Sequence, residues 1–428
     1  MGRRRVLMTM VAAVVAIMLL AAGCGGGGSG GGGGSNEAAT ARGPITYVQG
    51  KDNTNTIRPL LEKWNAAHPN EKATFKEQSD EADAQHDDLV QHFQAKDPNY
   101  DVASVDVIWT AEFAAKGWLQ PLKDSFALDT SKLLPATVKT ATYNNTLYAA
   151  PVTSDGGMLY YRKDLVPTPP KTWDEMIAMC PIAKKNNMDC YAGQFQKYEG
   201  LTVNASEAIN TAGGVIVGED GKTPSVNTPE AAKGLGRLAD AYKAGEIPKQ
   251  AITYTEEEGR ASFEAGKLLF LRQWPYVYSL ATTDGSSKVK GKFAVAPLPG
   301  DAGKPGASSL GGHNAAISAF SAHKATALDF LKFLETEESQ RWFVTQGSNA
   351  PALQALYDDP ALIKKAPYLP VLKTSILNAV PRPVSPFYPA VTKAVQDNAY
   401  AAIKGDKNVQ QALTDMQAAI QAASSAGG

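Results

Sequence analysis

The stretch Leu147–Val166, LYAAPVTSDGGMLYYRKDLV, marks the point at which the pattern of strands and helices starts again. Its segments YAAPV (148–152) and GMLYYR (157–162) are short and apolar, which predicts two buried strands. Between them we expect the chain to run extended through Pro151–Ser154. This stretch is therefore predicted to join two separate α/β units.

The residues before this junction predict alternating strands and helices. The predicted strands are ITYVQG (45–50), ATFKEQ (73–78) and DVASVDVIW (101–109). The predicted helices cover 57–68, which Pro69 ends, then 80–96 and 110–118. Alternation of this kind argues for a parallel sheet with helices on both faces.

The residues after the junction predict a second α/β unit. We expect a helix in TWDEMIAMC (172–180), with Thr172 as its N-cap. GGVIVGEDG (213–221) predicts a turn-rich hairpin and not a dinucleotide-binding loop, because no helical pattern follows it. From Val391 onward, alanine-rich sequence predicts helices to the end of the chain. The predicted fold class is α/β with two lobes.

The N-terminus has the features of a secretory signal. Arg3–Arg5 precede the apolar run Val6–Ala22, which is short for a bilayer span. The small residues before Cys24 resemble a bacterial lipoprotein box, in which the cysteine becomes the acylated first residue. We expect a signal peptide at 1–23, lipidation at Cys24 and a flexible Gly/Ser tether at 24–43. An uncleaved membrane anchor is the alternative.

Composition limits the classes of partner. The chain carries 42 Lys and Arg against 43 Asp and Glu, a formal net charge of −1. Both signs are interspersed, so no basic surface indicates a nucleic-acid partner. About 385 residues follow the tether, enough for two domains. No second apolar run is long enough to cross a membrane, and we expect a soluble extracytoplasmic body.

Two cysteines remain after the predicted lipidation site. Cys180 and Cys190 lie in AMCPIAKKNNMDCYAG, with proline and two asparagines between them. In an oxidising compartment this spacing favours a disulfide over two free thiols. No further Cys or His lies close by in the sequence, so no metal site is expected.

No catalytic motif stands out. The chain has no Gly-x-Ser-x-Gly and no Walker loop. Carboxylates are plentiful enough for a glycosidase pair, but none is marked by its context as a paired acid and base. The residues alone indicate no cofactor, and counting carboxylates does not exclude a glycosidase.

Polar and aromatic side chains lie at or near the ends of several predicted strands. Asp106 lies in SVDVIW, Asp155 follows YAAPV, and Trp274 and Tyr276 lie in RQWPYVYSL. Arg382 lies between two prolines that stiffen VPRPVSPFYP. Ligands of open α/β sheets bind at the carboxyl ends of strands, where carboxylates can accept sugar hydroxyls and aromatic faces can stack on sugar rings. These groups predict a saccharide site, with turns, helix caps, core packing and ion pairs as alternative roles.

The chain resembles the substrate-binding lipoproteins of carbohydrate ABC importers (extracellular solute-binding protein family 1), above all the trehalose/maltose-binding branch. The segments that carry the resemblance are SVDVIWTAEFAAKGWLQPL (104–122), LYAAPVTSDGGMLYYRKDLV (147–166), PKTWDEMI (170–177), QKYEGL (196–201), FEAGKLLFLRQWPYV (263–277), VAPLPG (295–300), LGGHNAAIS (310–318) and NAVPRPVSPFYP (378–389). Their order and spacing extend over the whole body, from Pro44 to about Ala423.

The resemblance implies a type II periplasmic-binding-protein fold, a clamp of two lobes joined by three chain crossings. The crossings are expected near Val152, Gly311 and Gly347. Lobe 1 would comprise 44–152 and 312–347, and lobe 2 would comprise 153–311 and 348–428.

The resemblance also implies the site residues. The predicted ligand-binding residues are Asp106, Asp155, Trp274, Tyr276, Gly311, Gly312, Arg382, Asn55, Asp80 and Glu207. The two aspartates at 106 and 155 match acceptors of sugar hydroxyls, the aromatic residues match the platform under the sugar ring, and the glycine pair matches a loop whose N–H groups face the ligand. The arginine matches a hydroxyl-binding arginine of the second lobe.

The first lobe departs from the family pattern at one end of the expected cleft. Asn55 stands where the family has a glutamate, and Asp80 where it has a threonine. Gln85 and His86 replace two consecutive arginines. These changes remove donors and charge, so the identity and length of the sugar are not implied.

The expected function is capture of an α-glucoside such as trehalose or maltose, and its delivery to the permease of an ABC importer. The protein would act as a monomer anchored by its lipid to the extracytoplasmic face of the cell membrane. A lipid-anchored secreted glycosidase and a passive cell-wall adhesin are the competing functions.

Overall fold

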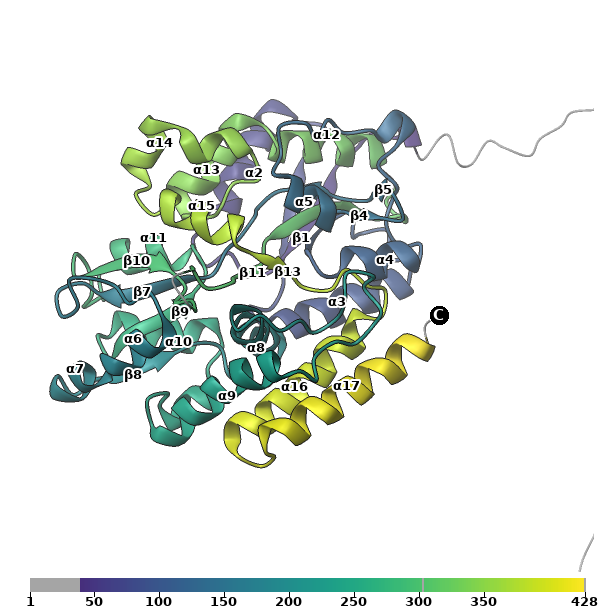
Figure 1. Ribbon diagram of the computed structural model, residues 1–428. Helices are drawn as coiled ribbons and strands as arrows, with labels where there is room; N and C mark the ends of the chain where they lie inside the picture. Colours follow the sequence, from purple (N-terminus) through teal and green to yellow (C-terminus); the bar gives the residue numbers. More distant parts are fainter. Residues whose placement is uncertain (1–38, 302–303, 427–428) are drawn as a thin grey trace, which may run out of the picture.

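The computed structural model describes residues 39–301 and 304–426 (Figure 1). The predicted signal peptide, the lipidation site Cys24 and the tether up to residue 38 lie outside the described residues. The predicted end of the tether is wrong. The Arg42 side chain pairs with Glu71 at 2.7 Å and with Asp329 at 2.6 Å, and Gly43 N donates to the Thr326 hydroxyl at 3.1 Å. The folded body therefore begins before Pro44.

The first lobe is built on a five-stranded sheet in the order β2-β1-β3-β12-β6. Its strands are β1 (Ile45–Gln49), β2 (Ala73–Glu77), β3 (Val102–Asp106), β6 (Ala150–Pro151) and β12 (His313–Ile317). β1 pairs in parallel with β2 and β3, whereas β12 is antiparallel to β3 and β6. The parallel pairing predicted for the strands before the junction is therefore present, whereas β12, which the chain adds on its return from the second lobe, runs antiparallel.

Helices of the first lobe arise where apolar residues recur at helical spacing. They are α2 (Ile57–Ala67), α3 (Ala82–Gln94), α4 (Thr110–Ala115), α5 (Pro135–Thr140), α12 (Lys324–Leu334) and α13 (Glu337–Gly347), with the short helix η1 (Asp124–Phe126) and the small hairpin β4 (Thr142–Tyr143) and β5 (Thr146–Leu147). In α2 the predicted apolar stripe Ile57, Leu60, Leu61 and Trp64 is buried. This stripe packs in one core cluster with β1 and α12.

The second lobe is built on a four-stranded sheet in the order β10-β7-β9-β8. Its strands are β7 (Met158–Arg162), β8 (Asp189–Ala192), β9 (Leu268–Gln273) and β10 (Phe293–Pro297). β7 is antiparallel to β9 and β10, and β8 is parallel to β9. All six residues of β9 are buried, which explains why the sequence LLFLRQ lacks the alternation of a half-exposed strand.

The remaining helices fall in the segments predicted for the second lobe. They are α6 (Trp173–Ala178), α7 (Cys180–Lys185), α8 (Glu199–Thr211), α9 (Pro229–Ala244), α10 (Glu256–Glu264), α11 (Val277–Thr283), α14 (Pro360–Lys365), α15 (Leu369–Leu377), α16 (Tyr388–Lys404) and α17 (Val409–Ala426), with the short helices η2 (Lys249–Thr253) and η3 (Gln354–Asp358). Thr172 caps α6 as predicted, since its hydroxyl accepts from Glu175 N at 3.2 Å. α16 and α17 lie side by side next to α8 and α9 (Figure 1).

The chain passes between the two sheets in the segments where crossings were expected. It leaves the first sheet after β6 and returns just before β12. After α13 it leaves again toward α15, which packs on β7 and β10 of the second sheet. Near the second crossing, β11 (Ser309–Leu310) pairs in parallel with β13 (Val380–Pro381). The predicted residue boundaries of the lobes stay a prediction.

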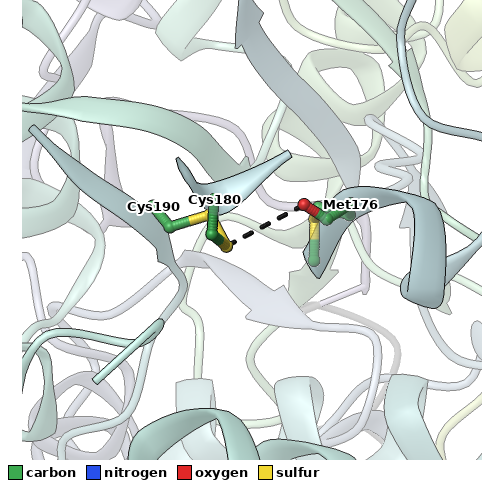
Figure 2. The surroundings of a disulfide bond; sticks show 3 residues. All are labelled: Met176, Cys180 and Cys190. Atoms are coloured by element: carbon green, nitrogen blue, oxygen red, sulfur yellow. Dashed lines mark hydrogen bonds between the residues drawn. A yellow bond between two sulfur atoms is a disulfide. The ribbon is translucent and has the colours of Figure 1, made fainter. Parts of the chain in front are cut away.

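A disulfide joins Cys180 at the start of α7 to Cys190 in β8, as Figure 2 shows, with the two Cα atoms 5.1 Å apart. The predicted pairing is therefore present in the structure. Neither cysteine lines the cavity between the lobes. The disulfide closes a local loop of the second lobe.

Candidate functional site

A cavity of about 240 Å³ lies between the two lobes, and both contribute to its wall. The first lobe supplies Gln49, Asp52, Asn53, Asp80, Gln85, Ser104, Asp106 and Trp109. The second lobe supplies Asp155, Glu199, Glu256, Glu257, Trp274, Tyr276 and Arg382. The crossing segments supply Val152, Thr153, Gly311, Gly312 and His313. Polar groups from distant parts of the sequence therefore meet at this cavity.

Most of the predicted site residues line this cavity. Those that do are Asp80, Asp106, Asp155, Trp274, Tyr276, Gly311, Gly312 and Arg382. Asn55 and Glu207 do not line it. Whether the lining residues bind a ligand stays a prediction, but the structure brings them together.

Asn55 has a backbone role in the turn before α2. Its φ is 51°, in the left-handed region that asparagine tolerates better than most residues. The turn is fixed by Asp52, whose carboxylate oxygens accept from Thr56 N at 2.8 Å and Ile57 N at 2.7 Å. The prediction of Asn55 as a ligand contact is therefore withdrawn. The neighbouring residues Asn53 and Thr54 face the cavity instead.

Glu207 lies on α8, behind the wall of the cavity. It is 5% exposed, and its carboxylate accepts from the Arg272 guanidinium at 2.7 and 2.6 Å. Because a charged carboxylate at this depth needs a charged partner, this pairing leaves no role as a ligand contact. The prediction of Glu207 as a ligand residue is withdrawn as well.

Arg382 connects carboxylates of both lobes. Its Nη2 donates to Asp106 Oδ1 at 3.0 Å, and its Nη1 donates to Glu199 Oε1 at 2.6 Å. Asp106 is the last residue of β3, where the strand ends at the cavity. Arg382 follows β13 and is 6% exposed. The pair therefore joins the two lobes at the cavity wall.

Glu199 holds this arginine from the other side. It is the first residue of α8, and its carboxylate also accepts from the hydroxyls of Tyr388 at 2.5 Å and Thr392 at 2.6 Å. Burial raises the pKa of Glu199, and the Arg382 guanidinium opposes that rise. With its oxygens occupied, Glu199 orients Arg382.

Asp155 lies on the first crossing, directly against the second. Its N–H donates to Gly311 O at 3.1 Å, and Gly311 N–H donates to Asp155 O at 2.8 Å. The expectation that Gly311 N–H faces a ligand is therefore wrong, because that donor is already used. Burial raises the pKa of the Asp155 carboxyl to about 7, and the nearby Asp106 carboxylate adds to the rise.

Gly312 is required by the backbone. Its φ is 111°, and a Cβ at this position would lie 2.2 Å from Thr153 O. At Gly311 a Cβ would lie 2.9 Å from Cζ3 of Trp274. The two glycines therefore let the crossings and the indole ring approach closely.

The aromatic residues lie just beyond β9. One side of the Trp274 ring is covered by the Arg272 guanidinium, 3.9 Å from the ring centroid. The Tyr276 hydroxyl donates to Glu257 Oε1 at 2.6 Å, and Asn53 Nδ2 of the first lobe donates to the same oxygen at 3.4 Å. A platform with one covered side and a polar rim suits the stacking of a ring that carries hydroxyl groups.

Sequence reasoning missed Glu199, Glu256 and Glu257. Glu256 accepts from the Tyr198 hydroxyl at 2.5 Å, and burial raises its pKa. Glu199 lies in QKYEGL, a segment that carries the family resemblance, so a signal was present there. The run TEEEGR gives no such signal, because acidic residues are common in the first turn of any helix.

The first lobe also contributes a polar segment around Asp80 to the cavity wall. The charged atoms of Asp80 and Lys51 lie 3.9 Å apart, and both side chains are exposed. Gln85 is buried, and its amide donates to Ser79 O at 2.9 Å. His86 does not line the cavity, and its ring binds Glu112 at 2.7 Å. This part of the wall therefore presents few free donors.

Metal-binding clusters and membrane-spanning helices are both absent from the described residues. Within 39–301 and 304–426, no group of three or more His, Cys, Asp or Glu side chains is arranged to hold a metal ion. None of the helices in these same ranges is both long and apolar enough to cross a membrane.

Comparison with known proteins gives consistent matches. Residues 50–341 match the family model described as bacterial extracellular solute-binding protein. A Deinococcus radiodurans protein named "Probable ABC transporter-binding protein" is 35% identical over 309 residues, 69% of this chain and 72% of that protein. The Bacillus subtilis galactooligosaccharide-binding protein is 26% identical over 243 residues, 54% of this chain and 55% of the relative.

A solved structure extends the similarity over most of the chain. Maltose-bound T. maritima MalE3 is 32% identical, with a TM-score of 0.83, and the alignment covers 88% of this chain and 99% of that one. The chain therefore has the same two-lobed fold.

Proposed function

Because the chain belongs to the bacterial extracellular solute-binding protein family, we propose that it captures an α-glucoside in the cavity between its lobes and hands it to the permease of an ABC importer. The family consists of substrate-binding proteins of ABC transporters, not enzymes, and it acts outside the cytoplasm. Family membership therefore argues against the alternative function of a lipid-anchored secreted glycosidase. The sugar and the residues that hold it are the proposed part.

The observation that carries the proposal is the ion pair between Arg382 of the second lobe and Asp106 of the first, 3.0 Å apart at the cavity wall. A sugar that donates hydroxyls to Asp106 and accepts from Arg382 would contact both lobes at once. Contacts of this kind are complete only when the lobes are shut, so they favour the closed state.

The chemistry of the wall supports a neutral sugar. Asp106 and Asp155 are acceptors for hydroxyl groups, and hydrogen bonds to charged groups are worth about 1.5–3 kcal/mol each. Trp274 and Tyr276 offer apolar surface beside them. Fixed acceptors next to an aromatic face match a sugar ring, which has hydroxyls at its edge and C–H groups on its face.

The size of the cavity supports a short ligand. Its volume of about 240 Å³ is slightly below the ~300–1,000 Å³ of typical ligand pockets. This favours a disaccharide over a long oligosaccharide. The related T. maritima structure holds maltose, a disaccharide and an α-glucoside, so maltose and trehalose are the sugars to test first.

The proposed attachment to the membrane rests on the sequence before the described residues. An apolar run that ends at Cys24 fits a lipid anchor, and the glycines that follow fit a flexible tether. A tethered binding protein could release its sugar to a permease in the same membrane and remain monomeric.

The test is a thermal-shift screen with maltose, trehalose and a galactooligosaccharide, followed by calorimetry of each sugar that shifts the transition. A sugar at 100 times its Kd should stabilise the fold by about 2.7 kcal/mol. We expect an α-glucoside to do so. A shift with the galactooligosaccharide alone would keep the class of function and overturn the choice of sugar, and no shift with any of the three would overturn the proposal.

A further inference from the structure

We propose that Arg272, held by Glu207, positions the Trp274 ring and so sets sugar affinity without touching the sugar. The inference rests on the proposed function only in taking Trp274 as the platform for the ligand. Neither Arg272 nor Glu207 lines the cavity between the lobes. Their effect would therefore reach the sugar through the indole ring.

The Arg272–Glu207 ion pair is almost completely enclosed. Arg272 is 1% exposed and Glu207 5%. Arg272 Nε donates to Glu207 Oε2 at 2.7 Å and Nη2 donates to Oε1 at 2.6 Å, while Nη1 donates to Gln194 Oε1 at 3.1 Å. The plane of the guanidinium is thus fixed at each of its nitrogens. A bidentate pair of this kind sets direction as well as distance.

The fixed guanidinium lies against Trp274. Its Cζ is 3.9 Å from the centroid of the ring, within the range of a cation–π contact. The ring is also bounded at Cζ3 and Cη2 by Gly311, where a Cβ would approach to 2.9 and 3.0 Å. The indole is therefore supported on one face by Arg272 and limited at one edge by the backbone of Gly311. The same ring lines the cavity.

The same carboxylate also holds both crossing segments. Glu207 Oε1 accepts from Ser309 N at 2.9 Å, just before the second crossing. The Ser308 hydroxyl accepts from Gly157 N on the first crossing at 2.6 Å. At Gly157 a Cβ would lie 2.7 Å from Arg272 Nη2, so the chain passes directly over the ion pair. One buried carboxylate, that of Glu207, therefore helps to fix both the position of the Trp274 ring and that of the crossing segments.

A role in positioning explains what stability alone does not. A buried ion pair is weak evidence for stability, because the cost of removing two charges from water can equal their attraction. A flat guanidinium has a property that other cations lack, since it can stack on an aromatic ring while it binds a carboxylate in plane. Lysine keeps the charge and loses both features, which makes Arg272→Lys the informative variant.

The first test needs no sugar. The six tryptophans are replaced by 5-fluorotryptophan, and the Trp274 resonance is assigned by its absence in Trp274→Phe. We expect Arg272→Lys to shift or broaden that fluorine resonance. The matched control is Arg162→Lys, which removes another bidentate pair of the same sheet, Arg162 with Asp164 at 2.8 and 2.6 Å. An unchanged Trp274 resonance in Arg272→Lys would overturn the inference.

The second test is a double-mutant cycle read by calorimetry with maltose. We expect Arg272→Lys to lower affinity about tenfold in the wild-type background and less than twofold in Trp274→Ala. Equal losses in both backgrounds would mean a general structural effect and would overturn the inference. If Arg272→Lys does not fold, the pair Arg272→Met with Glu207→Gln replaces it, because it leaves no unpaired charge.

The two tests separate the inference from the proposed function. If wild type binds no maltose while the fluorine resonance responds to Arg272→Lys, the choice of sugar fails and the positioning of Trp274 stands. If maltose binds and the resonance does not respond, the sugar stands and the inference fails.

Discussion

Desolvation raises the pKa of Asp155 to about 7, so its ionised form is less stable in the folded chain than in the unfolded one. The unfolded value is about 3.9, and the wild-type fold therefore loses stability as pH rises from about 4 to 7 and stays lower above that. Groups held in such an unfavourable state are typical of binding sites.

Asp155→Asn should make the fold more stable at high pH and yet weaken sugar binding. Since asparagine does not ionise, we expect the sugar-free variant to match wild type near pH 4 and to melt about 2–4 °C higher at pH 8. Its affinity for the sugar should nevertheless fall by roughly 10-fold, because a charged acceptor is lost. Scanning calorimetry at both pH values and titration with maltose check this. A lower melting temperature at pH 8 would contradict the assignment.

Gly312 allows a second prediction at the scale of single residues. Its φ of 111° and the contact with Thr153 O leave no room for a side chain. Gly312→Ala should therefore destabilise the fold by about 1–3 kcal/mol. Gly236 on α9 is the control, because it has open space around it and an unstrained backbone. Gly236→Ala should stabilise slightly, by about 0.5–1 kcal/mol. Urea unfolding of both variants tests the contrast.

The sequence allowed some of these residues to be predicted and not others. The sequence made it possible to predict Asp106, Asp155 and Trp274, because each lies in or next to a recognisable apolar strand. The roles of Glu199 and Glu207 could not be predicted, because their partners are distant in the sequence. Arg382 lies 183 residues from Glu199, and Arg272 lies 65 residues from Glu207. Only the tertiary structure decides whether a glutamate in a helix faces a ligand or an arginine.

At the scale of elements, the strands and helices were largely predictable and the sheet arrangement was not. The stripe of α2 and the cap of α6 follow from local spacing and side-chain chemistry. The antiparallel strand β12 does not, because its direction depends on a return of the chain from the other lobe. A non-local pairing of this kind leaves no periodic signal in the sequence.

The disulfide between α7 and β8 should act locally. It closes a separation of 10 residues, which the chain-entropy estimate values at about 2–3 kcal/mol. We expect Cys180→Ser with Cys190→Ser to lower the melting temperature and to leave the maltose Kd within twofold of wild type. A large loss of affinity in the folded variant would show instead that this loop is coupled to the cavity.

At the scale of the whole molecule, we propose that the segment before the described residues anchors the protein to the membrane. The apolar run ends at Cys24, and the proposed anchor predicts that Cys24→Ala appears in the medium. Fractionation of expressing cells and an immunoblot of the medium provide the measurement. A Cys24→Ala protein that stays with the membrane would mean that Val6–Ala22 is itself the anchor.

The two lobes meet where the proposed sugar contacts lie. The ion pair of Arg382 with Asp106 joins them, and so does the hydrogen bond from Asn53 to Glu257. Both pairs line the cavity, so a bound sugar would be enclosed by groups that already bridge the lobes. Trp274 supplies the apolar face and Arg382 the bridge, and each should matter separately.

The most direct test of the account is calorimetric titration of maltose into wild type, Trp274→Ala and Arg382→Ala. We predict one maltose bound per wild-type chain and an affinity at least about tenfold lower in each variant, because each loses a buried contact to the ligand. Gly236→Ala serves as the folded control and should bind like wild type. Saturable binding to wild type with both variants within twofold would contradict the proposed site, whatever the fold.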